Sequence, residues 1–139
     1  KKEYDYIFID CPPSIGTLTV NALTASDAAI IPVQCEYYAL EGLSQVLNTI
    51  GLVQQKLNKR LKIEGILFTM YDGRTNLSDQ VIESVKANLN ETIFDTVIPR
   101  NVRLAEAPSH GEPITIYDSS SRGAESYRML AAELLNKYI

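Results

Sequence analysis

The sequence is poor in the residues that build several common kinds of site. It has a single histidine, His110, which excludes a metal site made of several histidines. Ser14 lies in PPSIG and not in a G-x-S-x-G turn, so no serine nucleophile of the hydrolase kind is expected. No apolar run approaches the roughly 18 residues of a membrane-spanning helix, and no charged-then-apolar leader is seen. We therefore expect neither a stable membrane anchor nor secretion.

Cysteine is also scarce. Cys11 and Cys35 are too few for a disulfide scaffold in a chain of 139 residues, which favours a reducing cytoplasm. Each cysteine follows a predicted strand, so two thiolates from each of two subunits could hold an iron–sulfur cluster. The alternative is that they act as small hydrophobic residues, and the lack of a C-x-x-C spacing favours it.

The charge balance is acidic, with 17 acidic and 13 basic residues and a formal net charge of −4. Such a chain has no global attraction to nucleic acid or anionic lipid. Any contact with a polyanion must therefore come from a local basic patch. The length supports one compact domain.

Apolar patterns along the chain alternate between strand and helix signals. Runs rich in β-branched and aromatic residues predict strands, and apolar residues at three-to-four spacing predict amphipathic helices. This alternation is typical of an α/β fold with a mostly parallel sheet and helices on both faces. The predicted strands are 4–9, 28–33, 63–70 and 96–98, and the predicted helices are 17–25, 39–57, 78–89 and 124–138. Residues 100–113 are predicted to be irregular, with one helical turn at 104–107.

In the stretch YDYIFIDCPPS, residues 4–14, an aspartate directly follows a mainly apolar run and is followed in turn by a cysteine and two prolines. The run 4–9 predicts a strand buried on both faces, as in a parallel sheet covered by helices. Asp10 follows at the carboxyl end of this strand, where ligands collect in open parallel sheets. One interpretation is that Asp10 caps the next turn. The other is a Walker-B carboxylate that holds Mg²⁺ on nucleotide phosphates, usually through water.

Three arginines lie on predicted loops at the ends of two strands. Arg74 belongs to the polar loop 71–76, and Arg100 and Arg103 follow the fourth strand. A single exposed arginine is usually a solvated surface charge. Three of them on two loops at one sheet edge predict a local positive region, and guanidinium forks bind phosphate well.

Four segments resemble, in chain order, the ParA/Soj family of deviant Walker-A ATPases, which partition chromosomes and plasmids in bacteria. They are YDYIFIDCPPSIG, LTVNALTASDAAIIPVQCEYYALEGLSQVLNTI, TMYDGRTNLSDQV and IPRNVRLAEAPSHGEPITIYD, and together they cover essentially the whole chain. The resemblance implies the P-loop NTPase fold of the MinD-like superfamily, with ATP and Mg²⁺ as cofactors. It also implies an ATP-dependent homodimer that binds DNA without sequence preference, a ParB-type partner, and a cytoplasmic, nucleoid-associated location.

The resemblance further implies roles for single residues around the nucleotide. Asp10 matches the Walker-B aspartate, which is catalytic and binds Mg²⁺, usually through water. Pro12 turns the chain along the nucleotide edge. Met70, Pro99 and Arg100 match segments that lie near the adenine base.

Arg74 and Arg103 match arginines through which the family's ATP-bound dimer binds DNA. Contact of this kind with the phosphate backbone requires positive charge and not a base-reading helix. The resemblance thus gives a specific role to two of the three loop arginines.

The sequence departs from the family pattern in one respect. The family's phosphate loop, of the form KGGxGKT, is not in it, and neither is the acidic segment between that loop and the Walker-B strand. We therefore interpret residues 1–139 as a single-domain fragment, the C-terminal half of an ATPase domain, and do not expect it to hydrolyse ATP alone. In the family the loop-bearing strand lies beside residues 4–10, so we expect exposed apolar side chains there.

Two alternatives stay open. One is a MinD-like ATPase that acts at the membrane in division-site placement. Attachment to the membrane would then require an amphipathic basic tail after the last helix. The sequence ends NKYI with no such extension. The other is an iron–sulfur redox carrier like the nitrogenase reductase, which the cysteine placement disfavours.

Overall fold

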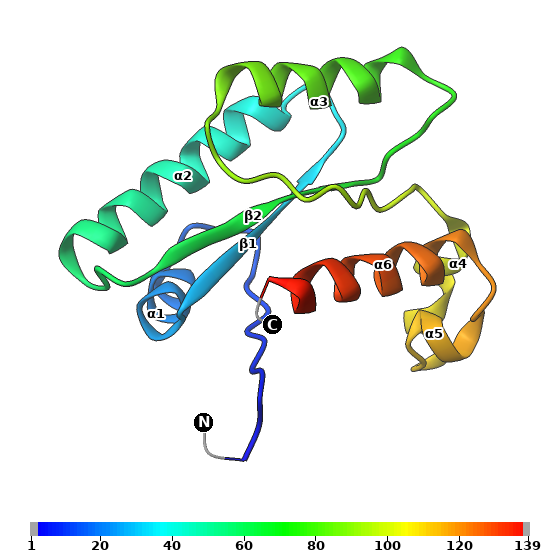
Figure 1. Ribbon diagram of the computed structural model, residues 1–139, viewed down its shortest axis with the longest axis horizontal. Coiled ribbons are helices and arrows are strands. Elements are labelled where there is room, and N and C mark those ends of the chain that lie inside the picture. The colour runs from blue at the N-terminus through cyan, green and yellow to red at the C-terminus, as the bar shows by residue number, and fades with distance from the viewer. Residues whose placement is uncertain (1–2, 138–139) are drawn as a thin grey trace. The chain divides into compact units, whose positions relative to one another are not determined.

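The computed structural model describes residues 3–137, and it confirms an α/β chain with a parallel sheet. Strands β1 and β2 lie side by side (Figure 1). The elements are α1 Thr17–Ala25, β1 Ala28–Gln34, α2 Ala39–Lys56, β2 Lys62–Thr69, α3 Asn76–Asn88, α4 Val102–Glu106, a 3₁₀ turn at Ala107–His110, α5 Ile114–Tyr117 and α6 Arg122–Asn136. All four predicted helices are therefore confirmed to within two residues at each described end.

The described residues fall into two compact units, and both β1 and α2 contribute to each of them. One unit combines the chain up to Ala29 with Ser44–Lys62. The other combines Ile30–Leu43 with the chain from Ile63 onward.

Side-chain amides at the end of α2 hold the first unit together. Asn58 Nδ2 donates to the carbonyl oxygens of Leu23 and Ser26, at 3.1 and 2.8 Å. Gln54 Nε2 donates to the carbonyl of Leu61 at 2.9 Å. The last carbonyls of a helix have no partner within the helix, so the Asn58 amide stabilises the end of α1.

The predicted strand at residues 4–9 is not a strand in the structure. The segment belongs to no sheet, and its apolar side chains are exposed, Phe8 by 74%. A strand needs a hydrogen-bonded neighbour, and the sheet of β1 and β2 contains no strand paired with residues 4–9. The expectation of burial on both faces is thus wrong here, whereas the expectation of exposed apolar side chains is confirmed.

The second unit is built around β2 and the segment that follows α3. Leu67, Phe94 and Ile98 form its buried cluster. Partly buried side chains from β1, α4 and α6 pack against this cluster, namely Ile30, Leu104, Leu130 and Leu134. Gly65 is required on β2, because a Cβ there would lie 2.7 Å from Cε2 of Phe94.

The predicted fourth strand, 96–98, is not formed as a strand. Isolated parallel bridges to the β2 segment lie on either side of it, Ile66 to Ile93 and Tyr71 to Pro99, and within it the N–H of Ile98 donates to the carbonyl of Phe68 at 2.9 Å. Between the bridges, the backbone N–H groups of Asp95 and Thr96 turn away to the carboxylate of Glu133 on α6, at 2.8 and 3.0 Å. The ladder is interrupted for this reason, so the strand prediction is only partly correct.

The hydrogen bonds to the Glu133 carboxylate change its pKa. Burial alone would raise the pKa of Glu133, but the hydrogen bonds from Thr96 and from the two backbone groups outweigh it and lower the pKa. Glu133 therefore remains an ionised acceptor for the backbone near neutral pH.

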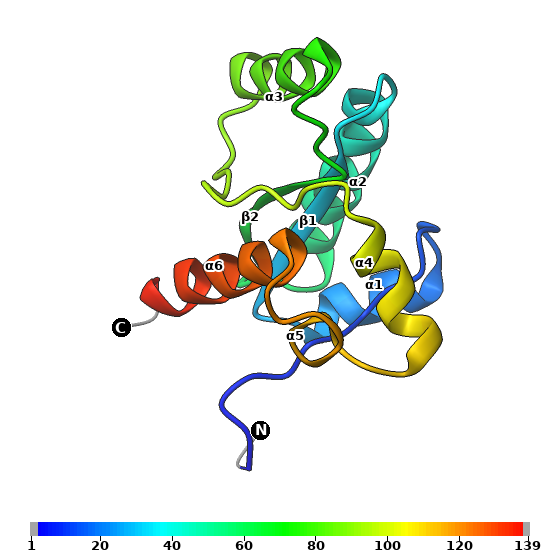
Figure 2. The ribbon, with the colours of Figure 1, turned by 90° about the vertical axis from the view of Figure 1, so that its right-hand side faces the viewer.

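The segment expected to be irregular is largely helical. α4, the 3₁₀ turn and α5 occupy most of 102–117, and Figures 1 and 2 both place α4 and α5 beside the start of α6. Asn101 caps α4, with its side chain accepting from the N–H of Arg103. Gly123 allows the close approach, because a Cβ there would lie 2.6 Å from Cγ of Leu104. Among residues 3–137, no helix has both the length and the apolar content needed to cross a membrane.

Candidate functional site

Asp10 lies in the first unit, on the exposed segment that leads into α1. Beyond the two prolines, the carbonyl of Ser14 accepts from the N–H of Gly16 at 3.0 Å and from Oγ1 of Thr19 at 2.8 Å. These contacts fix the turn between Asp10 and the helix. Pro12 is exposed, two residues before this turn.

A Mg²⁺ ion fits this donor chemistry. Mg²⁺ keeps several water ligands and commonly takes only one or two carboxylates, the rest coming from substrate phosphates. The exposed carboxylate of Asp10 can supply such a contact directly or through water. No cluster of three or more acidic, histidine or cysteine side chains suited to a metal occurs in residues 3–137, so a site of protein ligands alone is not formed there.

The residues predicted to lie near the adenine base come together in the second unit. Tyr71 N donates to the carbonyl of Ile98 at 3.1 Å, and Arg100 N donates to the carbonyl of Tyr71 at 2.8 Å. This pairing brings Met70 into the same edge as Pro99 and Arg100. The structure thus places the backbone of these three residues together, while their contact with a base stays a prediction.

Met70 has an unusual backbone. Its φ of 55° lies in the left-handed region, and it is the only residue other than glycine with positive φ among those described. That conformation costs a non-glycine residue about 1 kcal/mol or more. Strain of this kind often marks a functional site, and here it falls at the end of β2, beside the candidate base edge.

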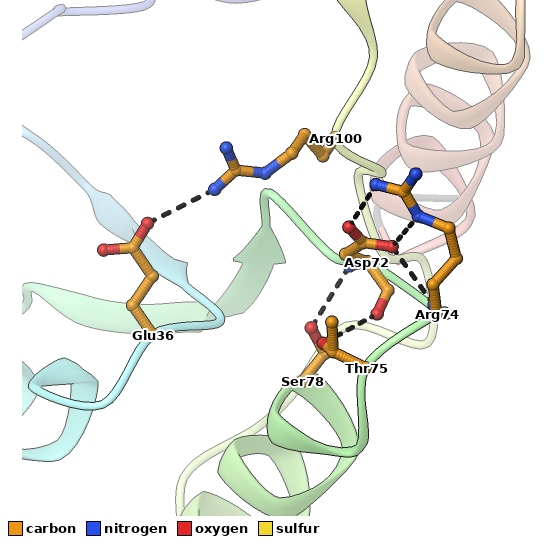
Figure 3. Close-up of polar contacts among 6 residues, drawn as sticks. All are labelled: Glu36, Asp72, Arg74, Thr75, Ser78 and Arg100. Atoms are coloured by element: carbon orange, nitrogen blue, oxygen red, sulfur yellow. Dashed lines mark hydrogen bonds and ion pairs between the residues drawn. The ribbon is translucent and has the colours of Figure 1, made fainter.

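Arg100 is joined to the loop after β1. Its Nη2 lies 3.4 Å from Oε1 of Glu36, and both side chains are about half exposed (Figure 3). The contact ties the two strand-end loops of this unit together. Sequence reasoning did not single out Glu36, and its distance of 64 residues from Arg100 gave no signal for the pairing.

Arg74 is held in a bidentate ion pair by Asp72 (Figure 3). Its Nε donates to Oδ1 at 2.9 Å and its Nη2 to Oδ2 at 2.7 Å. The hydrogen bonds from Arg74 hold the pKa of Asp72 well below its usual range, so the carboxylate stays ionised. Asp72 was also missed from sequence, although an aspartate two residues before an arginine in a turn is a recognisable pattern.

Arg103 lies in a second cluster of charges, formed by α4 and α5. Its Nη1 is 2.9 Å from Oε2 of Glu106, and its Nε is 3.4 Å from Oδ2 of Asp118. The hydroxyl of Tyr117 donates to the same Glu106 oxygen at 3.2 Å. The hydrogen bond from Arg103 lowers the pKa of Glu106. His110 stacks on the ring of Tyr117, with the ring centroids 4.8 Å apart.

The cysteines differ in their surroundings. Cys11 is exposed in the first unit, and Cys35 is buried in the second. Burial, with a smaller contribution from Asp79, raises the pKa of Cys35 to about 11. Cys35 is therefore a protonated core thiol near neutral pH, as the hydrophobic interpretation predicts, and not a ready thiolate ligand.

Comparison with known proteins gives the context for these residues. A family model described as an AAA domain matches residues 1–63. Over 134 residues, 96% of this chain, the sequence is 67% identical to the sporulation initiation inhibitor protein Soj of Bacillus subtilis, of which it covers 53%. It is 58% identical to the chromosome partitioning protein ParA of Myxococcus xanthus, over 97% of this chain and 48% of that protein. The chain thus spans about half the length of the curated relatives that it matches.

Solved structures share the fold. Cobyrinic acid a,c-diamide synthase from Mycobacterium smegmatis, with bound ADP and magnesium, matches with a TM-score of 0.76 and 39% identity, over 93% of this chain and 46% of that one. The cell division ATPase MinD from Pyrococcus furiosus matches with a TM-score of 0.74 and 26% identity, over 100% of this chain and 54% of that one. The fold is accordingly part of a P-loop NTPase fold. By its sequence, the chain belongs to the Soj/ParA family of chromosome-partitioning ATPases, about half of whose length it spans.

Proposed function

We propose that this chain is the C-terminal half of a chromosome- or plasmid-partitioning ATPase domain whose ATP-bound homodimer binds DNA without sequence preference. The observation that carries the proposal is the 67% identity to Soj over 96% of the chain. We further propose that the full-length protein works in the cytoplasm on the nucleoid and responds to a ParB-type partner.

The chain's own residues supply two parts of this activity. The carboxylate of Asp10 would hold Mg²⁺, which neutralises charge on nucleotide phosphates when bound. The strand-end edge of Met70, Pro99 and Arg100 would border the base. Its backbone is fixed by the pairing of Tyr71 with Ile98 and Arg100. The base is therefore expected to lie at the strand ends of the second unit, because ligands bind at strand ends in open α/β sheets.

The DNA contacts are assigned to Arg74 and Arg103. Both side chains are exposed, by 85% and 54%, and both lie on segments that follow the strand-end edge. Exposed guanidinium groups suit sequence-independent contact with phosphates. Because the net charge of the chain is −4, such local charges must provide the attraction to DNA.

A MinD-like role at the membrane is less well supported. The MinD structure is 26% identical to this chain, against 67% for Soj and 58% for ParA. The larger similarity favours partition of DNA over attachment to a membrane.

The DNA assignment can be tested by charge reversal in the full-length protein. Arg74→Glu and Arg103→Glu are each expected to weaken DNA binding about tenfold or more, whatever the DNA sequence, because each removes an arginine–phosphate interaction. Each variant should also lower the slope of log affinity against log salt by about one, because one fewer phosphate is neutralised. Binding would be measured with ATP present over a series of salt concentrations.

The control is Arg60→Glu, which makes the same charge change at an exposed residue beyond the end of α2. ATP affinity should survive all three changes, because none of these residues is assigned to the nucleotide. Superimposable salt curves for wild type and the two loop variants would remove the DNA assignment of Arg74 and Arg103.

A further inference from the structure

Both arginines proposed to contact DNA are already paired with carboxylates of this chain. Arg74 is held by Asp72 in the loop after β2, and Arg103 by Glu106 of its own helix α4 and by Asp118 just after α5. The two arrangements use different elements of the second unit. An incoming phosphate therefore meets guanidinium groups whose charge is largely neutralised, and not free positive charges.

The pairing of Arg74 is the better defined, because the loop fixes Asp72. The N–H of Asp72 donates to Oγ of Ser78 at 3.1 Å, and its carbonyl accepts from N and Oγ1 of Thr75, both at 3.1 Å (Figure 3). Ser78 itself is buried in α3. The side chain of Asp72 is only 20% exposed, whereas that of Arg74 is 85% exposed. The carboxylate is thus the fixed partner, and the guanidinium is the group free to turn outward.

The carboxylate occupies the same face of Arg74 that a phosphate would use. Two parallel N–H···O bonds from Nε and Nη2 reach the two oxygens of Asp72, and a bidentate phosphate contact uses this fork in the same way. A phosphate must displace Asp72 from the fork or approach a nearly neutral pair. Exposed ion pairs are weak, so displacement is possible, but it lowers the affinity.

We propose that Asp72 is a positioning residue that limits the affinity of Arg74 for the phosphates of DNA by competing for its guanidinium fork. The proposal rests on the DNA-binding role proposed above for Arg74. Asp72 would keep binding weak enough to be reversed, while the loop holds Arg74 ready at the surface.

The test is Asp72→Asn in the full-length protein with ATP. Asparagine keeps an oxygen for the Arg74 backbone N–H, which Asp72 accepts at 3.1 Å, so the turn is preserved while the charge is removed. We expect DNA affinity at moderate salt to rise about two- to fivefold, the range that exposed ion pairs provide. The slope of log affinity against log salt should steepen by up to about one. In this variant Arg74 neutralises a DNA phosphate without leaving an unpaired carboxylate beside that phosphate.

Three further variants make the result specific. Asp95→Asn makes the same change at an exposed position of the same unit with no arginine paired to it in the described residues, and should leave DNA affinity within twofold of wild type. Arg74→Gln should weaken binding. In the Arg74→Gln background, Asp72→Asn should give no gain. Affinity for a fluorescent ATP analogue, measured in parallel, should not change, which separates DNA phosphate from nucleotide phosphate.

Each outcome has a separate meaning. If Arg74→Gln leaves DNA binding intact, the proposed DNA role of Arg74 fails. If Arg74→Gln weakens binding but Asp72→Asn leaves it unchanged or weakens it, the DNA role survives and the competition by Asp72 is overturned. A gain in DNA affinity from Asp72→Asn that persists in the Arg74→Gln background would also overturn the competition by Asp72. The gain would then come from the loss of one negative charge and not from freeing Arg74.

Discussion

Replacing Asp10 with alanine is expected to abolish ATP hydrolysis by the full-length protein while leaving its thermal stability almost unchanged. The carboxylate is proposed to hold Mg²⁺ on the nucleotide, and losing a group that organises the metal costs about 10²-fold or more in kcat. The side chain is exposed, on a segment outside the sheet, so its loss removes little packing. Substitutions at such positions usually change stability by less than about 0.5 kcal/mol.

The measurement is Mg²⁺-dependent phosphate release at saturating ATP, together with a thermal unfolding curve for each variant. Asp5→Ala is the matched control, because Asp5 is an exposed carboxylate on the same segment, five residues earlier. It should hydrolyse ATP at the wild-type rate. Normal turnover by Asp10→Ala would show that Asp10 has no role at the metal.

The helices could be predicted well from the sequence because their signals are local. Apolar residues at three-to-four spacing located α2, α3 and α6, and α1 was predicted at Thr17–Ala25, the residues it occupies. The strands were predicted less well, because a strand exists only with a neighbour. Residues 4–9 have strong strand composition and yet form no strand, since no described strand pairs with them.

The sequence indicated which loops lie together at the strand ends, but not which side chains of these loops contact one another. That Pro99 and Arg100 share an edge with Met70 follows from the rule that parallel strands end together. The pairing of Arg100 with Glu36 joins residues 64 positions apart, which no local pattern encodes. The capture of the Asp95 and Thr96 backbone by Glu133 is of the same kind, and it interrupts the fourth strand that local composition predicts.

The pairing of the three loop arginines with carboxylates could not be predicted from the sequence either. Three arginines on two loops predict a positive region, but the structure pairs each of them with a carboxylate, namely Arg74 with Asp72, Arg100 with Glu36, and Arg103 with both Glu106 and Asp118. Residue counts cannot show which acid neutralises which base. Any positive potential at these loops therefore depends on how readily the pairs open.

The largest effect on stability is expected for Phe94→Ala. The ring is 2% exposed, forms part of the buried cluster with Leu67 and Ile98, and has the ammonium of Lys137 4.2 Å from its centroid. Truncation of a buried phenylalanine leaves a cavity and costs about 3–5 kcal/mol. Native stability is typically about 5–15 kcal/mol, so about a fifth of it or more would be lost. Chemical denaturation followed by circular dichroism measures the loss, and Met129→Ala, at an exposed position of α6, should cost less than about 0.5 kcal/mol.

A compensating pair tests whether the ring has the packing described. Gly65→Ala alone should destabilise the protein, because its Cβ would lie 2.7 Å from one ring carbon of Phe94 and 2.9 Å from another. Phe94→Leu removes Cε2, the nearer of the two carbons, and replaces the rigid ring with two methyl groups that can turn away, so Gly65→Ala should cost less in the Phe94→Leu background than in wild type. Residues in direct contact commonly show coupling of about 0.5–3 kcal/mol in such double-mutant cycles. Additive costs would mean that the ring does not lie against β2 at Gly65, and the buried cluster of this unit would then need a different centre.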